Sequence, residues 1–184
     1  MLIAYLRERV PLRVYAPLAL ALGACADLRD PWLPALAASA LLLQFRLWDD
    51  LADRAHDAVA HPTRVLVRAA DVRPLIALCL ALAVLNVCVA VWRDATGVAV
   101  SVLAATDAAL ATWYLARRER TAFGDHLLLA KYPAMLIVVA GERVVAAPVP
   151  ILVSAAVLYL AACLYEAWHD RSSPLARYLS IGGH

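Results

Sequence analysis

The stretch WDDLADRAHDAVAHPTRVL, from Trp48 to Leu66, ends an apolar segment in a group of four carboxylates. If the helix continues, Asp50, Asp53 and Asp57 fall at i, i+3 and i+7 and share one face with Arg46. Like charges at this spacing destabilise a helix by roughly 0.2–0.5 kcal/mol per pair, so the group needs a compensating cation. Carboxylate oxygens are hard ligands, and this pattern suits Mg²⁺ carrying a phosphate-bearing substrate. The simpler interpretation is a solvated acidic helix end at a membrane surface.

The composition places the chain in a membrane. Hydrophobic residues make up 64% of the 184 residues and the mean hydropathy is +0.72, whereas soluble domains have about 45–50% apolar residues. Charged residues, at 17%, lie between apolar runs, and the net charge of +2 is too small to indicate a nucleic-acid partner. We therefore expect an all-α integral membrane protein whose partner is the lipid bilayer.

Apolar runs set the number of membrane spans. A bilayer core about 30 Å thick requires about 20 mostly apolar residues per helix. Six spans in a single helical domain are expected, at roughly 11–26, 32–48, 74–92, 98–115, 124–140 and 149–168. In this topology most arginines gather on one side, and only Arg29, Arg93 and Arg143 lie on the other. The termini and the aspartate stretch are therefore predicted to be cytoplasmic.

A second polar group, CLYEAWHDRSSP from Cys163 to Pro174, ends the sixth expected span. Glu166 and Asp170 are four residues apart and share a helix face, toward which His169 also leans. Taken alone, this pattern is typical of a solvated helix end. Its predicted place on the same side of the membrane as the aspartates makes it a candidate second acidic site.

Two ionisable residues fall inside expected spans. Lys131, in LLLAKYPAML, and Asp107 lie at similar predicted depth. A charge at membrane depth is costly and indicates either a functional contact or an ion pair. Lys131 is thus a candidate substrate contact or the partner of Asp107, and Tyr132 is placed facing the bundle. A cation carrier is a further alternative, although the carboxylates cluster at one surface.

The stretch from Trp48 to Leu66 resembles the first aspartate motif of the UbiA superfamily of intramembrane prenyltransferases. Four aspartates match its acidic positions and three residues match its tail, namely Asp49, Asp50, Asp53 and Asp57, then Pro62, Arg64 and Leu66. His61 stands where the family usually has Arg. Tyr165 and Glu166 resemble the Tyr-Asp opening of the family's second acidic motif, and His169 beside Asp170 departs from it. Arg117 and Arg118 resemble the basic segment after the family's fourth span.

The resemblance implies a Mg²⁺-dependent enzyme that ionises an allylic prenyl diphosphate and transfers the prenyl group to an acceptor, which the sequence does not identify. The implied catalytic residues are Asp50, Asp53 and Lys131. The implied magnesium ligands are Asp49, Asp50, Asp53, Asp57, Glu166 and Asp170. The implied substrate-binding residues are Arg46, Arg64, Arg117, Arg118, Lys131, Tyr132, Tyr165 and His169.

The chain departs from the family in length. Familiar members have nine spans, whereas six are expected here, so the last three helices of the usual bundle are missing. Three explanations are open. Either six helices suffice for a small substrate, or a second copy completes the wall around the isoprenoid chamber as a homo-oligomer, or the activity has been lost. Two alternatives to a transferase therefore stay open: a UbiA-type membrane terpene cyclase, and a non-catalytic module that binds an isoprenoid or assembles with a partner.

Overall fold

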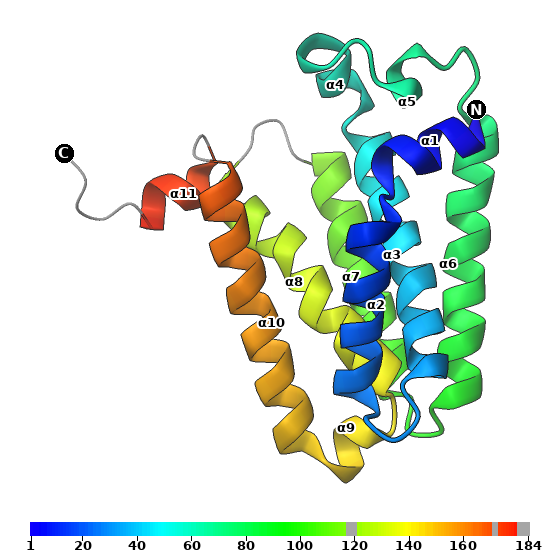
Figure 1. Ribbon diagram of the computed structural model, residues 1–184, viewed down its shortest axis with the longest axis vertical. Coiled ribbons are helices and arrows are strands. Elements are labelled where there is room, and N and C mark those ends of the chain that lie inside the picture. Colours follow the sequence, from blue (N-terminus) through cyan, green and yellow to red (C-terminus); the bar gives the residue numbers. More distant parts are fainter. Residues whose placement is uncertain (117–120, 171–172, 180–184) are drawn as a thin grey trace. The chain divides into compact units, whose positions relative to one another are not determined.

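The computed structural model describes residues 1–116, 121–170 and 173–179, and every regular element in these ranges is a helix (Figure 1). This confirms the expected all-α class. Four helices are long and apolar enough to cross a bilayer: α6 (Arg73–Arg93), α7 (Val98–Ala116), α8 (Ala122–Ala140) and α10 (Pro148–His169). They support a membrane protein and coincide with four of the six expected spans.

The other two expected spans also form helices. α2 (Leu12–Ala26) has 15 residues, fewer than the roughly 17–25 that a span needs. α3 (Trp32–Ala52) has 21 residues and is long enough, but Arg46, Asp49 and Asp50 lie in its last two turns and lower its hydropathy. Six spans therefore stay a prediction.

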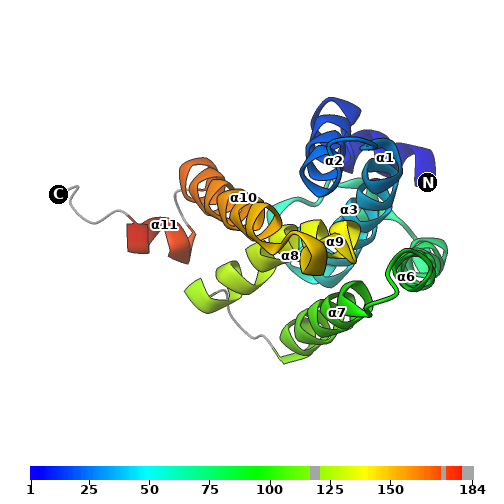
Figure 2. The same ribbon diagram turned by 90° about the horizontal axis from the view of Figure 1, so that it is seen from below.

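The chain divides into two compact units, an N-terminal unit (Met1–Trp92) and a C-terminal unit (Arg93–His184). In the N-terminal unit α2 and α3 form an antiparallel hairpin, and α6 lies along the other side of α3 (Figures 1 and 2). The buried Asn86 amide of α6 donates a 2.7 Å hydrogen bond to the buried Gln44 side-chain oxygen of α3. A polar contact inside an apolar helix pair fixes which faces meet.

Three short helices cover one end of this unit: α1 (Leu2–Arg9), α4 (Arg54–Ala60) and α5 (Val65–Arg68). Tyr5 of α1, Leu47 of α3, Leu66 of α5 and Leu75 of α6 form one buried apolar cluster. Burying these side chains holds α1 and α5 against the ends of the long helices. The same end carries the aspartate stretch.

In the C-terminal unit α8 packs against both α7 and α10, and two short helices, α9 (Arg143–Ala146) and α11 (Pro174–Leu179), complete the described part. Asp94 is buried before α7 and accepts hydrogen bonds from the Thr96 hydroxyl and the Ala99 N–H, at 2.5 and 2.6 Å. Burial alone would raise the pKa of Asp94, but these hydrogen bonds hold it below its ordinary value. The turn between α6 and α7 is thus held by a charged carboxylate.

The contact between α2 and α3 depends on Gly23. A Cβ added there would lie 2.5 Å from the Pro31 carbonyl oxygen and 2.8 Å from the Ala35 backbone nitrogen. Helix propensity alone predicts that Gly23→Ala stabilises a helix by about 1 kcal/mol. Because backbone atoms block the added methyl group, we expect the opposite, a loss of about 1–3 kcal/mol. Unfolding in mixed micelles with increasing SDS measures this difference.

Ala21→Val is the matched control, because Ala21 is exposed on the same helix. It should change the free energy of unfolding by less than about 0.5 kcal/mol. A Gly23→Ala protein as stable as the parent would contradict the close approach of the two helices.

Candidate functional site at the end of α3

The aspartate stretch spans the junction of two helices. α3 ends at Ala52 and α4 begins at Arg54, so the uninterrupted helix considered from the sequence is broken at Asp53. Asp53 keeps a right-handed helical backbone, with φ −88° and ψ −2°, and its N–H still bonds to the Asp49 carbonyl. The carboxylates therefore stay close to the expected helical order across this junction.

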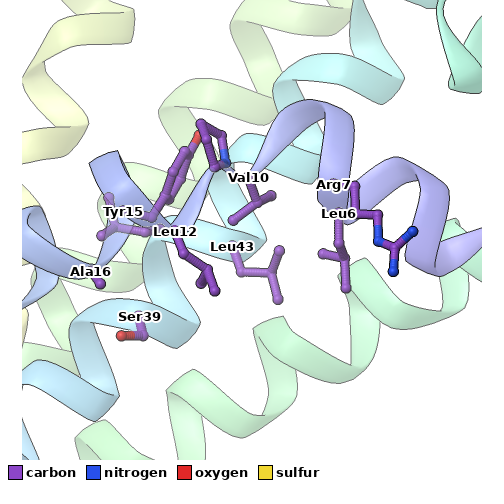
Figure 3. Close-up of a pocket in the computed structure, with 10 residues that line it drawn as sticks. Leu6, Arg7, Val10, Leu12, Tyr15, Ala16, Ser39 and Leu43 are labelled. Carbon is purple, nitrogen blue, oxygen red and sulfur yellow. The ribbon is translucent and has the colours of Figure 1, made fainter.

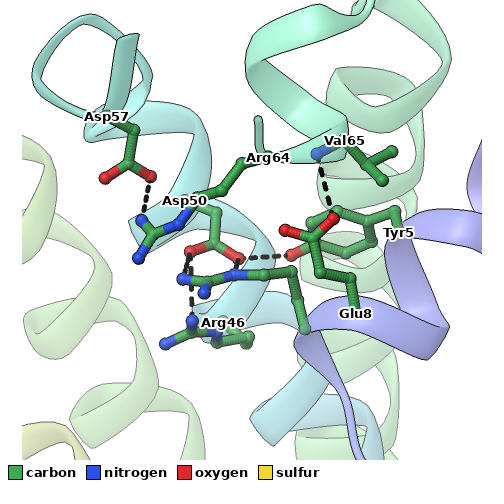
Figure 4. A network of polar contacts seen from close by, with 8 residues as sticks. Tyr5, Glu8, Arg46, Asp50, Asp57, Arg64 and Val65 are labelled. Carbon is green, nitrogen blue, oxygen red and sulfur yellow. Dashed lines mark hydrogen bonds and ion pairs between the residues drawn. The ribbon is translucent and has the colours of Figure 1, made fainter. Parts of the chain in front are cut away.

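Asp50 is the centre of the polar contacts at this end (Figure 4). Its side chain is buried, and both oxygens accept hydrogen bonds from Arg9 of α1, Nη2 at 2.6 Å and Nε at 3.0 Å. The Tyr5 hydroxyl donates to the same carboxylate at 2.9 Å, and Arg46 Nη2 lies 3.3 Å from it. These four residues, Tyr5, Arg9, Arg46 and Asp50, form what we call the Asp50 cluster.

The Asp50 cluster shifts the pKa values of two of its own members, Tyr5 and Arg9. Burial, and then the nearby Asp50 charge, raise the pKa of Tyr5 far above its ordinary value, so the phenol stays protonated and donates. The hydrogen bond to Asp50 raises the pKa of Arg9, which keeps that guanidinium charged although burial opposes it. A bidentate arginine–carboxylate pair is among the stronger polar contacts in proteins.

A second ion pair lies beside the cluster. Arg64, in the segment between α4 and α5, pairs with the buried Asp57 of α4 (Figure 4).

The Glu8 carboxylate of α1 accepts a 2.9 Å hydrogen bond from the Val65 N–H at the start of α5. Arg54 donates to the carbonyl oxygens of Leu66 and Ala69. These contacts tie α1, α4 and α5 together over the end of α3.

These contacts bear on whether magnesium fits the carboxylates. Both oxygens of Asp50 accept from arginine, and Asp57 is paired with Arg64. Within residues 1–116, 121–170 and 173–179, no three His, Cys, Asp or Glu side chains are grouped so that they could hold a metal ion. As arranged, the described acidic residues do not form a ligand set for a resident Mg²⁺. Arginine supplies the compensating cation, and magnesium binding at Asp49, Asp50, Asp53 and Asp57 stays a prediction.

The remaining candidates from the sequence lie in the C-terminal unit. Glu166 and Asp170 are half-buried at the end of α10, where the Tyr165 and His169 rings stack at 5.3 Å. Lys131 is buried in α8, with its Nζ 5.7 Å from the centre of the Tyr132 ring. Whether Lys131 contacts substrate or pairs with Asp107 stays a prediction. Arg117 and Arg118 lie outside the described residues.

The sequence analysis missed two members of the Asp50 cluster. Tyr5 and Arg9 are four residues apart on α1 and share a face, which is the signal that marks them. It also missed the buried Asp125 in the first turn of α8, whose Oδ2 accepts from the Leu175 N–H of α11 at 3.3 Å. Thr121 caps this helix by accepting from the Gly124 N–H, which is the local signal for that helix start.

Comparison of the chain with protein-family models, with curated proteins and with solved structures finds no match. The function must therefore be argued from the arrangement of the residues themselves.

A double-mutant cycle tests the pairing in the Asp50 cluster. We expect Arg9→Gln and Asp50→Asn each to lower the free energy of unfolding by about 2 kcal/mol, because each leaves a partner with fewer charged hydrogen bonds. Because the two residues contact one another, the double variant should lose less than the sum, by about 1–2 kcal/mol. Arg13→Gln, at an exposed arginine of α2, is the control and should change little. Strictly additive losses would contradict the pairing.

The raised pKa of Tyr5 predicts that the free energy of unfolding falls at alkaline pH. A group whose pKa is higher in the folded than in the unfolded state contributes stability below its unfolded pKa, about 10 for tyrosine, and loses it at higher pH. The advantage of the parent over Tyr5→Phe should thus be constant to about pH 9 and fall above pH 10, by at most about 1.4 kcal/mol per pH unit. Unfolding at pH 8, 10 and 11 measures it. A difference between the parent and Tyr5→Phe that stays unchanged up to pH 11 would contradict the raised pKa of Tyr5.

Proposed function

We propose that this chain is an intramembrane prenyltransferase that binds a prenyl diphosphate at the end of α3, ionises it and transfers the prenyl group to an acceptor. The observation that carries the proposal is the convergence of three guanidinium groups on one end of an apolar helical unit. Arg9 and Arg46 contact Asp50, and Arg64 contacts Asp57. The resemblance of the aspartate stretch to the UbiA motif agrees with this placement.

Arg46 supports an anion as the ligand. Its Nη2 reaches Asp50, but its Nε is buried and has no hydrogen-bond partner among the described residues. A buried donor without a partner is unfavourable by about 1–3 kcal/mol. An incoming diphosphate oxygen would satisfy it, and arginine is suited to phosphate because its planar donors match two oxygens at once.

The chemistry follows from the charges. In ionisation the allylic carbon–oxygen bond breaks and its electron pair leaves with the diphosphate oxygen. Arginine groups held in place beforehand neutralise the charge that develops on that oxygen. The acceptor then attacks the allylic cation and loses a proton, and the apolar helices exclude water that would otherwise capture the cation. Mg²⁺ enters this proposal as part of the substrate, bound to the diphosphate.

The proposal extends to features beyond the Asp50 cluster. Asp53, at the junction of α3 and α4, is half-buried and is the carboxylate we assign to the magnesium–diphosphate complex together with Asp49. Six spans, cytoplasmic termini and a homo-oligomer belong to the same proposal. Cyclisation in place of transfer is the variant that needs no acceptor.

One observation favours a second candidate function. Asp50, at the central position of the motif, is held by Arg9, Arg46 and Tyr5. Because Asp50 already contacts these three side chains, the arrangement also suits a non-catalytic module that binds an isoprenoid phosphate through its arginines. The two functions differ in one measurable product, free diphosphate.

Diphosphate release from purified protein separates the two. The protein, in nanodiscs with Mg²⁺, is offered geranyl, farnesyl and geranylgeranyl diphosphate, with and without electron-rich acceptors. We expect release, and a fall of at least about 100-fold for Asp53→Asn, as is typical when a positioned group in the reaction is lost. Release without any acceptor would identify a cyclase.

Asp30→Asn is the matched control, since Asp30 is exposed in the connection between α2 and α3. It should release diphosphate at the parental rate. If folded parent protein binds a prenyl diphosphate but releases none from any donor, the enzyme is excluded and the binding module stands.

A further inference from the structure

A cavity of about 620 Å³ lies inside the N-terminal unit, where α1 passes into α2 and both face α3 (Figure 3). Leu6 of α1, Leu12 of α2 and Leu43 of α3 surround the same space. The volume is in the range of about 300–1,000 Å³ that small-molecule sites occupy. The space is therefore large enough for a ligand chain.

The wall of the cavity is suited to hydrocarbon. Seven of the ten lining residues are aliphatic or proline, and the Ser39 hydroxyl is already donated to the Ala35 carbonyl at 2.8 Å. An apolar space offers water too few partners to hold it. Leu12, at the edge, is 77% exposed, so the cavity opens toward the surroundings of the helices. For a helix of a membrane protein those surroundings are lipid.

The rim of the cavity carries a positive charge. Arg7 lines it, is exposed, and turns its guanidinium away from the apolar side chains (Figure 3). Its neighbours Glu8 and Arg9 are committed to Val65 and Asp50. No hydrogen bond or ion pair joins Arg7 to another of the described residues. An apolar cavity with an available cation at its rim matches a molecule with a hydrocarbon chain and an anionic head.

The position of α1 indicates which molecule this is. α1 is a short helix outside the long ones, and its Leu2 and Ile3 are exposed while Tyr5 is buried. Such a helix suits the membrane interface, where its apolar side chains enter the acyl region and its arginines meet lipid phosphates. At this depth the most abundant chain-bearing anions are the phospholipids of the leaflet.

We propose that this cavity binds one acyl chain of an anionic phospholipid from the surrounding bilayer, with the lipid phosphate on Arg7. The lipid is not a substrate, and the proposal is independent of the prenyltransferase function. Its chain lies against Leu6 and Val10, next to Arg9, and thereby supports the docking of α1 that holds Asp50. Bound lipid is expected to strengthen the Asp50 cluster.

Retention of defined lipids by the full chain tests the site. Delipidated protein in detergent is titrated with phosphatidylglycerol or phosphatidylcholine of identical chains, and bound lipid is counted by native mass spectrometry. We expect one tightly held phosphatidylglycerol and about fivefold weaker phosphatidylcholine, the difference that one arginine contributes at a lipid surface. Arg7→Gln should remove this preference, and Arg13→Gln, outside the cavity, should keep it.

Filling the cavity tests the chain. Leu43→Trp should lower retention of both lipids at least tenfold, whereas Leu36→Trp, on an exposed face of α3, should leave it unchanged. Ser39→Met fills the same space with a flexible side chain and serves if Leu43→Trp does not fold. Equal retention by the filled and control proteins would overturn the site.

Competition distinguishes the lipid from a prenyl substrate. Farnesyl diphosphate should leave the bound phosphatidylglycerol in place. If it displaces the lipid, the cavity holds the isoprenoid chain and the phospholipid proposal is overturned. Diphosphate release by the parent and by Leu36→Trp tests the proposed enzyme activity separately.

Discussion

Neutralisation of the buried Asp50 carboxylate is the constraint on which the N-terminal unit depends. A charge removed from water is tolerated only if it is paired and hydrogen-bonded. Asp50 lies near the end of an apolar helix and obtains its partners from Arg46 on its own helix and from Tyr5 and Arg9, more than forty residues earlier. α1 lies over the end of α3, and this arrangement brings Arg9 within reach of the carboxylate.

The polar and apolar contacts at this end are coupled through one side chain. The Tyr5 ring belongs to the buried cluster with Leu47, Leu66 and Leu75, and its hydroxyl donates to Asp50. Glu8 on the same helix accepts from the Val65 N–H, which places α5. Movement of α1 away from α3 would therefore expose the apolar Tyr5 ring and, at the same time, remove two partners of the buried Asp50 charge. This coupling makes α1, a helix of only eight residues, a fixed part of the site.

Periodicity and composition predicted the helical class, the four long apolar helices and the acidic end of α3. Each of these features depends only on residues that are close together in the sequence. The Arg9–Asp50 pair could not be predicted in this way. Arg7, Arg9 and Arg13 are equivalent as positive charges beside a membrane, and only the direction of α1 decides that Arg9 meets the carboxylate. Likewise, four aspartates indicate a cation without indicating whether it is a metal ion or a guanidinium.

That distinction matters for the proposed chemistry. Arginine and a carboxylate form a pair of fixed geometry, and a diphosphate presents the same planar pairs of oxygens with more negative charge. In the proposed enzyme a prenyl diphosphate would compete with Asp50 for Arg9 and Arg46, because the buried Nε of Arg46 offers a donor that Asp50 does not use. The arginines would then hold the diphosphate, and Asp49 and Asp53 would be the residues to hold the Mg²⁺ bound to it. In the proposed enzyme the arginines balance the charges of Asp50 and Asp57 until the substrate arrives, so that one set of charges serves first the fold and then the reaction.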